Sequence, residues 1–343
     1  MIKRKYDYFI GVDVSRNKLD YAVINDQDFL YHRTKPNTVA DITAFLDELR
    51  ALPKFKLSKA LFVMEYTGLY CNHILEVLKK SKVQFAQESA MRIKNSSGLI
   101  RGKHDKIDAI RIANYACKNF KDLHLWVTRR PIILQLSNLC TLRNRLISTQ
   151  GSLRTPLKEQ YLFVKQGIYK QSLSACKNTL KAIELDIVNI NSQIDELINS
   201  DDNLKRLITI ITSVPAIGTV TAIQIILSTN EFTQMNDAKK FACYAGIAPF
   251  KKESGNSMSK GKVSRIANRK MKSLLHICAM VAVSMKGGEL RDYYKRKVET
   301  EGKPKMLALN AVRYKLVSRI FSCLRGNRVF EKDFNNKLNS VVC

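Results

Sequence analysis

Two carboxylates in the first third of the sequence lie in or beside apolar runs, where a negative charge is costly. Asp13 interrupts the run 8–14, and Glu65 follows the run 60–64. A carboxylate inside a hydrophobic strand costs several kcal/mol of desolvation unless a metal ion or a basic partner compensates it. Both residues are therefore candidates for a site that binds a cation.

Two further carboxylates, Asp105 and Asp108, precede a helical stripe of small and apolar residues: Ala109, Ile112, Ala113 and Ala116. Spacings of three and four residues place both acids at the edge of that stripe. Four carboxylates that converge from two strands and one helix repel one another, and hard divalent cations stabilise such clusters. We therefore expect a site for two Mg²⁺ or Mn²⁺ ions that assists phosphoryl transfer. Four separate surface carboxylates are the alternative.

The elements that must position these residues alternate within 1–125. Three short apolar runs, 8–14, 19–24 and 29–34, have connections too short for a crossover helix and predict an antiparallel meander. A helix that begins at Asn37 or Thr38, a strand over 60–64, a helix, a strand over 83–86 and another helix follow. This order is that of the ribonuclease H-like α/β fold.

A helical spacer is predicted after this domain. Apolar residues from Leu173 to Leu204 keep steps of three and four residues, broken only at Asp201, which predicts a coiled coil with a partner helix in the same chain or in a second protomer. The stretch 184–202 has acids but no Lys or Arg, so we expect it to face protein. The run 207–227 predicts two helices around the turn 214–218, either a corner or an element that aims N–H groups at phosphate. The predicted domains are 1–125, 126–206, a mainly α-helical 207–330 and a tail, 331–343.

The composition indicates a folded protein with a polyanionic partner. Hydrophobic residues make up 45% of the 343 residues, which excludes disorder for most of the chain. Lys and Arg exceed Asp and Glu by 58 to 30, a formal net charge of +28, so DNA or RNA is the expected partner. No run reaches the roughly 18 uncharged apolar residues of a membrane span, and the cytoplasm is the expected location. The eight cysteines form no C-x-x-C and predict reduced thiols.

Basic residues flank Asp105 and fill a second segment around Ser254, where the composition of 253–262 predicts a flexible loop. Gly255 would let a DNA backbone approach Ser254 closely, and the neighbouring lysines could hold a phosphate. A solvated basic face is the alternative. The residues predicted to bind nucleic acid are Arg101, Lys103, Lys106, Lys251, Lys252, Lys260, Lys262, Arg265 and Arg269.

Short motifs in both halves resemble those of one family. GVDVS at 11–15, EYTGLY at 65–70 and DKIDA at 105–109 resemble the motifs of the DEDD transposases of bacterial insertion sequences, whose first domain is similar to the RuvC resolvase. GIAP at 246–249, ESG at 253–255 and SRIANR at 264–269 resemble that family's second domain. The resemblance runs from Tyr8 to about Leu324. The chain departs from the family at Ala267, where Gly is common, and at Lys272, where Arg is usual.

The resemblance implies a function and roles for five residues. By this resemblance, the residues that bind metal are Asp13, Glu65, Asp105 and Asp108. Ser254 is the nucleophile that attacks DNA and forms a covalent phosphoserine. The family also implies a structured bridge RNA that pairs with target and donor DNA, in a bacterial cytoplasm and on its nucleoid. Because a free serine is a poor nucleophile, we expect metals beside Ser254, in a composite site between protomers of a dimer or tetramer joined by the coiled coil.

Other functions stay open on the sequence. A metal-dependent, structure-selective endonuclease would use water as the nucleophile and form no covalent adduct with DNA. A non-enzymatic nucleic-acid-binding protein would use the carboxylates only to balance local positive charge, and would show no Mg²⁺-dependent cleavage. An actin-like ATPase also has an aspartate on its first strand, but the sequence near Asp13 has no Gly-rich phosphate loop.

Overall fold

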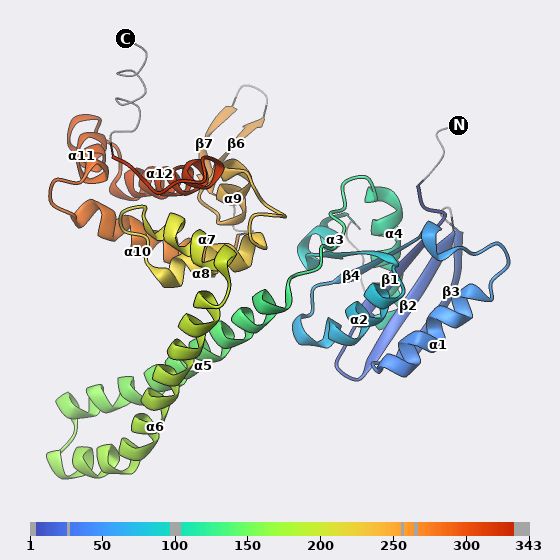
Figure 1. Cartoon of the computed structure of the whole chain (residues 1–343), viewed down its shortest axis with the longest axis horizontal. Helices are drawn as coiled ribbons and strands as arrows, with labels where there is room; N and C mark the ends of the chain where they lie inside the picture. The colour runs from blue at the N-terminus through green and yellow to red at the C-terminus, as the bar shows by residue number, and fades with distance from the viewer. Residues whose placement is uncertain (1–4, 26–27, 97–103, 255–256, 264–266, 333–343) are drawn as a thin grey trace. The chain divides into compact units, whose positions relative to one another are not determined.

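The chain, described here from a computed structural model, forms two compact units, Met1–Thr128 and Arg129–Cys343 (Figure 1). The structure describes residues 5–25, 28–96, 104–254, 257–263 and 267–332, with the backbone alone in 250–263. Three residues predicted to bind nucleic acid, Arg101, Lys103 and Arg265, lie outside the described residues. None of the described helices is both long and apolar enough to cross a membrane.

The N-terminal unit is built on a five-stranded mixed sheet. Strands β1 (Tyr8–Val14), β2 (Lys18–Asn25) and β3 (Asp28–Pro36) form an antiparallel meander. Strands β4 (Ala60–Glu65) and β5 (Gln84–Glu88) continue the sheet in parallel to β1, in the order β3-β2-β1-β4-β5. The predicted meander and both later strands are confirmed.

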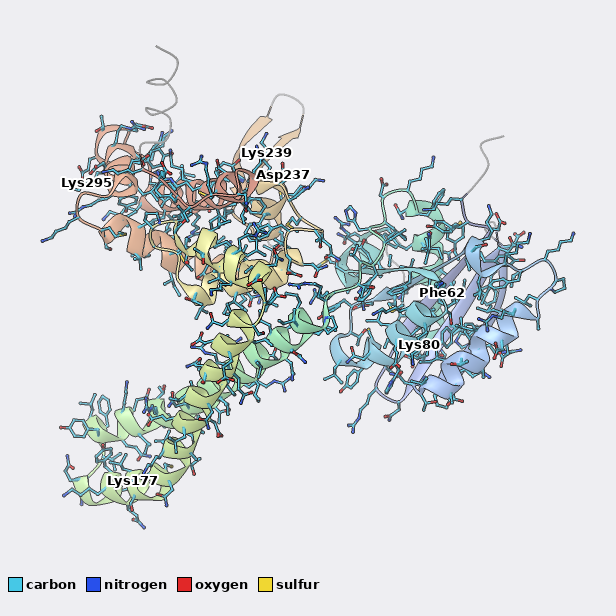
Figure 2. All side chains as sticks on the ribbon, in the orientation of Figure 1. Phe62, Lys80, Lys177, Asp237, Lys239 and Lys295 are labelled. Carbon is cyan, nitrogen blue, oxygen red and sulfur yellow. The ribbon has the colours of Figure 1, made fainter. Side chains whose placement is uncertain are left out.

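Helices cover both faces of this sheet (Figure 1). One face packs against α1 (Val39–Arg50) and α2 (Asn72–Lys80), and the other against α3 (Ala90–Ser96) and α4 (Asp105–Asn119). Short 3-10 turns, Leu57–Lys59 and Gly68–Cys71, precede β4 and α2. The predicted cap is Thr38, whose side chain accepts a hydrogen bond from Asp41 N. Phe62 lies inside the packed layers, whereas Lys80 ends α2 at the surface (Figure 2).

The C-terminal unit is mainly helical. Its elements in chain order are α5 (Pro131–Phe163), α6 (Gln166–Asn199), α7 (Asp202–Thr212), α8 (Thr219–Thr229), α9 (Ala238–Tyr244), β6 (Pro249–Ser254), β7 (Ser257–Val263), α10 (Arg269–Ser284), α11 (Glu289–Lys295), a π turn (Arg296–Thr300) and α12 (Lys305–Arg325). The loop predicted around Ser254 is wrong, because β6 and β7 pair as an antiparallel hairpin. Composition alone does not show backbone pairing between two segments.

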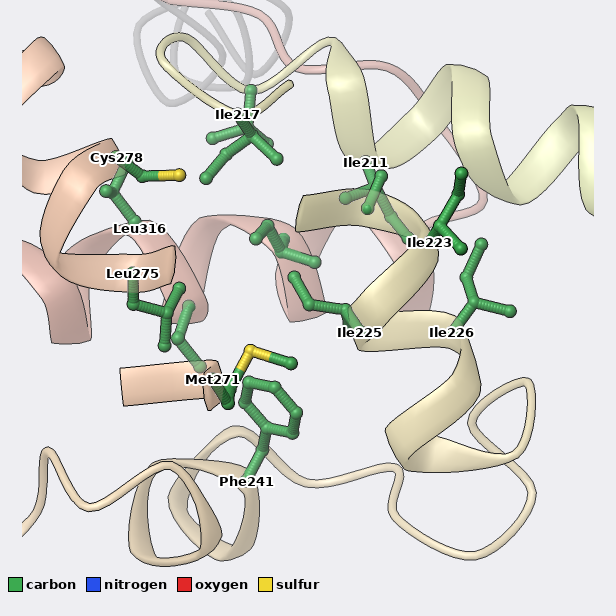
Figure 3. Packing of buried hydrophobic residues seen from close by; sticks show 14 of the residues in the cluster. Ile211, Ile217, Ile223, Ile225, Ile226, Phe241, Met271, Leu275, Cys278 and Leu316 are labelled. Carbon is green, nitrogen blue, oxygen red and sulfur yellow. The ribbon is translucent and has the colours of Figure 1, made fainter. Parts of the chain in front are cut away.

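One apolar core joins most helices of this unit. Ile211, Ile225, Phe241, Met271 and Leu275 pack together at its centre (Figure 3). Residues near the inner ends of the long helices, such as Ile133 of α5 and Ile194 of α6, belong to the same core. The segment predicted as a spacer is therefore part of this unit, because one end of α5 and one end of α6 pack into its core.

The heptad pattern faces α5 of the same chain over much of its length. Ile183, Ile190 and Ile194 of α6 are buried, and the Arg143 side chain of α5 donates a 2.6 Å hydrogen bond to Asn191 of α6. Glu184 of α6 pairs with Arg154 of α5 at the surface, and the other acids of the helix, Asp186, Asp195 and Glu196, are exposed, so the expectation that this stretch faces protein stays a prediction. The break at Asp201 marks the end of a helix: α6 stops at Asn199, and Asp201 caps α7.

Candidate active site

One edge of the N-terminal sheet carries carboxylates on four adjacent strands. Asp13 on β1 lies opposite Asp20 on β2, and Glu65 on β4 lies opposite Glu88 on β5. The parallel strands β1 and β4 pair up to Val12 and Met64, so Asp13 and Glu65 occupy the next positions on each strand. Strand side chains alternate between faces. Phe9, four residues before Asp13, and Val63, two residues before Glu65, belong to the core beneath α4, which places Asp13 and Glu65 on the α4 face.

Helix α4 brings the other two predicted acids to this edge, because Asp105 and Asp108 lie in its first turn. Its close packing on β1 depends on Gly11. A Cβ atom at Gly11 would lie 2.2 Å from Ala109 O and 2.3 Å from Ala113 N, both backbone atoms of α4. The sequence showed Gly11 only as part of a motif, and its steric role appears with the packed helix.

The carboxylates lie close enough to repel one another. The pKa of Asp13 is raised to about 6, first by burial and then by the negative charges of Asp105, Asp108, Asp20 and Glu65. Burial also raises the pKa of Glu65, and the charge of Asp108 adds to that rise. The structure therefore gathers all four predicted carboxylates into one electrostatic cluster.

The two acids on the helix have cationic partners that the two on the strands lack. Asp105 Oδ2 lies 2.7 Å from Lys18 Nζ, and Asp108 Oδ1 accepts a 2.6 Å hydrogen bond from Arg111. Within the described part of the chain, neither the Asp13 nor the Glu65 side chain has a hydrogen-bond or ion-pair partner. The uncompensated charge is thus concentrated on the strand pair.

Sequence reasoning missed Asp20, the fifth acid of this cluster. Its side chain is buried and accepts a 2.6 Å hydrogen bond from Thr34, while His32 Nε2 lies 2.9 Å and Lys18 Nζ 3.2 Å away. A signal was present, because Asp20 interrupts the apolar run 19–24 just as Asp13 interrupts the run 8–14.

The donor set fits a hard divalent cation in its chemistry. All donors are carboxylate oxygens, the ligands that Mg²⁺ and Mn²⁺ prefer, and two of them lack a counter-charge. Among the described residues, however, no group of three or more His, Cys, Asp or Glu side chains is arranged so that it could hold a metal ion. Lys18 and Arg111 hold the carboxylates of α4 instead. The two-metal site stays a prediction.

Ser254 belongs to the C-terminal unit, where it ends β6 opposite Ser257 of β7. The base of this hairpin is closely packed: Gly246 has a left-handed φ of +65°, and a Cβ there would lie 2.3 Å from the Cβ of Ala267. Asn310 of α12 donates a 2.7 Å hydrogen bond to Ile247 O. The departure at Ala267 therefore lies at the foot of the hairpin.

The six described residues that the sequence predicted to bind nucleic acid lie on α4, on α10 and on the β6–β7 hairpin. Lys106 is exposed in the first turn of α4, and Arg269 is exposed at the start of α10. Four further predicted residues lie on the hairpin strands, Lys251, Lys252, Lys260 and Lys262.

Sequence comparisons match both units to transposases. Residues 10–161 match a family described as transposase, of the DEDD type of IS110, and residues 208–295 match the transposase IS116/IS110/IS902 family. The pilin gene-inverting proteins of Moraxella bovis and Moraxella lacunata are each 24% identical over 335 residues, which cover 94% of this chain and 98% of each relative. An uncharacterized 44.8 kDa protein of insertion element IS116 from Streptomyces clavuligerus is 28% identical over 44% of this chain and 36% of its own length.

Proposed function

Because this chain belongs to the IS110 family of transposases, we propose that it recombines DNA through a covalent link to Ser254. The Ser254 Oγ would form a bond to a DNA phosphorus atom as the P–O bond to the neighbouring nucleotide breaks, and that nucleotide leaves as a hydroxyl. The phosphoserine keeps the bond energy for rejoining, so no cofactor is hydrolysed. Divalent ions bound at Asp13, Glu65, Asp105 and Asp108 would stabilise the charge on the phosphoryl oxygens.

One observation carries the metal part of this proposal. Asp13 is partly buried with its pKa raised to about 6, surrounded by four other carboxylates and without a counter-charge of its own. Such an arrangement costs folding free energy and is typical of a functional site. A bound divalent cation removes that cost, and among the described residues no Lys or Arg pairs with Asp13 or Glu65, unlike Asp105 and Asp108.

We further propose that the N-terminal unit has the ribonuclease H-like fold of the RuvC resolvase. The strand order β3-β2-β1-β4-β5, with three antiparallel strands followed by two parallel ones, supports this assignment. The position of the carboxylates on the central strands and on the helix that packs across them supports it as well.

The proposed partners are DNA, a structured guide RNA and further copies of the chain. The net charge of +28 and the exposed Lys106 and Arg269 support binding of nucleic acid. An exposed apolar strip on α6, which includes Leu185 and Val188, supports a coiled coil with a second protomer beyond the pairing with α5. The relatives from Moraxella bovis and Moraxella lacunata are named for inverting a gene, which supports DNA as the substrate.

Trapping the covalent intermediate tests the serine mechanism. Full-length protein, Mg²⁺, the element's noncoding RNA and labelled donor and target DNA are mixed and then denatured. Wild type and Ser259→Ala should give a protein–DNA adduct, and Ser254→Ala should bind both nucleic acids but give none. Recombination by Ser254→Ala at the wild-type rate would overturn the mechanism. Mg²⁺-dependent cleavage without any adduct would instead indicate an endonuclease that uses water.

The same assay tests guidance by RNA. Protein freed of nucleic acid should cut the target only after the noncoding RNA is added, and a scrambled RNA of the same length should not replace it. Sequence-specific recombination by RNA-free protein would remove the RNA from the proposal while leaving the serine and metal roles intact.

A further inference from the structure

Lys18 bridges two carboxylates at the edge of the acidic cluster. Its Nζ lies 2.7 Å from Asp105 Oδ2 on α4 and 3.2 Å from Asp20 Oδ2 on β2. The backbone at Lys18 is held by the β1–β2 turn, where Ser15 N and Ser15 Oγ both donate to Lys18 O, at 3.0 and 2.8 Å. One ammonium group thus ties the first turn of α4 to the edge of the sheet.

The two carboxylates that Lys18 joins differ in exposure to solvent. Asp20 is 5% exposed and has two further partners, Thr34 and His32, on β3. Asp105 is 46% exposed. Asp20 is therefore a buried anchor for the ammonium group, and Asp105 is the carboxylate that an ion arriving from solvent can reach.

Lys18 and a metal ion would compete for the same carboxylate. If Asp105 binds a divalent ion, an ammonium group within hydrogen-bond distance of that carboxylate faces a double positive charge only a few ångströms away, and the two cations repel each other. Asp20 offers Lys18 a second carboxylate on which it can remain. The pairing of Arg111 differs, because Asp108 lies on the same helix as Arg111, whereas Lys18 joins that helix to Asp20 on the sheet.

We propose that Lys18 is an exchangeable counter-ion of the metal site, which holds Asp105 toward Asp20 in the metal-free protein and releases Asp105 when a divalent ion binds. The inference rests on the proposed metal function and deepens it. Lys18 is a positioning residue in this scheme, because it acts on Asp105 and on no reacting atom. Asp20 keeps the released ammonium group beside the site.

Calorimetric titration of the full-length, metal-free protein with Mn²⁺ tests this inference without any DNA. Lys18→Met should lower the dissociation constant for Mn²⁺ by roughly three- to tenfold, because it removes a partly exposed ion pair that binding must break and a like charge that binding must tolerate. The matched control is Lys35→Met, whose ammonium group pairs with Glu48 between β3 and α1 and which should bind Mn²⁺ like wild type. Circular dichroism would verify that both variants fold, and Lys18→Gln replaces Lys18→Met if the latter does not.

A double-mutant cycle identifies Asp105 as the carboxylate in question. In an Asp105→Asn background, Lys18→Met should no longer tighten Mn²⁺ binding. Unchanged or weaker Mn²⁺ binding by Lys18→Met in the wild-type background would refute the role of Lys18 and leave the metal site standing. If wild type and every variant bind no Mn²⁺, the proposed metal function itself fails.

Discussion

Each unit contains a group of acidic side chains, and the pKa values of the two groups are shifted in opposite directions. In the C-terminal unit the Arg130 guanidinium lies between Asp201 and Glu231, with its Nη1 2.7 Å from Asp201 Oδ2 and its Nε 2.9 Å from Glu231 Oε2. The hydrogen bond from Arg130 lowers the pKa of Asp201 to about 2. In the N-terminal unit, burial and neighbouring carboxylates raise the pKa of Asp13 to about 6.

The acids around Arg130 therefore stabilise the folded state, whereas the acidic cluster around Asp13 destabilises it. Each pKa unit corresponds to about 1.4 kcal/mol, so the two aspartates shift the free energy of unfolding by a few kcal/mol in opposite directions before screening is considered. Arg130 joins the start of α5, the cap of α7 and the turn after α8, which is a structural task. Asp13 and Glu65 join nothing within the described chain, which leaves them available to a ligand.

The largest expected difference is in activity. Asp13→Asn keeps the size of the side chain but removes its charge, and we expect it to reduce DNA strand cleavage by roughly 10³-fold or more, as loss of a metal ligand does. Asp201→Asn should stay within about threefold of wild type at 25 °C, since hydrogen bonds and packing, rather than the reaction, use that carboxylate. Single-turnover cleavage of labelled DNA measures both. If Asp13→Asn and Asp201→Asn lost cleavage activity equally, the distinction between a catalytic and a structural group of acids would be wrong.

The next largest expected effect is on stability, through the close packing of α4 on β1. Gly11→Ala places a Cβ against backbone atoms of α4, at 2.2 Å from Ala109 O, and should destabilise the N-terminal unit by about 3 kcal/mol or displace the helix. Gly151→Ala in α5 meets no atom within 4 Å and should stabilise by up to about 1 kcal/mol through helix propensity. Urea unfolding followed by circular dichroism compares the two. A tolerated Gly11→Ala would mean that another arrangement holds the acids.

Loss of Arg130 should be the strongest single-charge effect on the C-terminal unit. Arg130→Met leaves Asp201 and Glu231 without their shared cation, and because the Arg130 side chain is 42% exposed we expect a screened cost of about 2 kcal/mol. The more exposed pair Arg154 and Glu184 provides the control: Arg154→Met should cost less than about 0.5 kcal/mol. Denaturant midpoints at pH 7 measure both, and equal costs would argue against a structural role for Arg130.

The smallest expected effect has the opposite sign and depends on pH. The Asp13 pKa is about 6 in the folded chain and near 3.8 when unfolded, so the folded state holds its proton longer as pH rises. The resulting loss of stability begins near pH 4 and is complete above pH 6. Asp13→Asn should therefore stabilise the metal-free protein by about 1 kcal/mol at pH 7.5 and leave it unchanged below pH 4. Melting temperatures of wild type and Asp13→Asn in EDTA, at pH 7.5 and below pH 4, measure this effect. A lower melting temperature for Asp13→Asn at pH 7.5 would mean that the charge of Asp13 is compensated in the folded protein.

Local patterns in the sequence predicted the strands and helices of the N-terminal unit and four of the five acids of the cluster, all but Asp20. Short apolar runs predicted the strands, and β1, β2 and β4 are apolar on both faces because helices cover both faces of the sheet there. Asp13 and Glu65 could be found because a charge within or beside a run of apolar residues is conspicuous without any knowledge of the fold. The motifs around them were sufficient to identify the family, which the comparisons confirm.

Pairings between distant residues were decided only by the tertiary structure. Asp20 joins the cluster because the β1–β2 turn sets a register in which Asp13 lies opposite Asp20, and a shift by one residue would turn Asp20 to the other face. Lys18 meets Asp105 because Gly11 allows α4 to pack closely on β1. The same holds for Arg130 and Asp201, which are 71 positions apart in the chain. Composition shows how many charges a protein has, whereas register and close packing decide which of them are neutralised and which are left for a ligand.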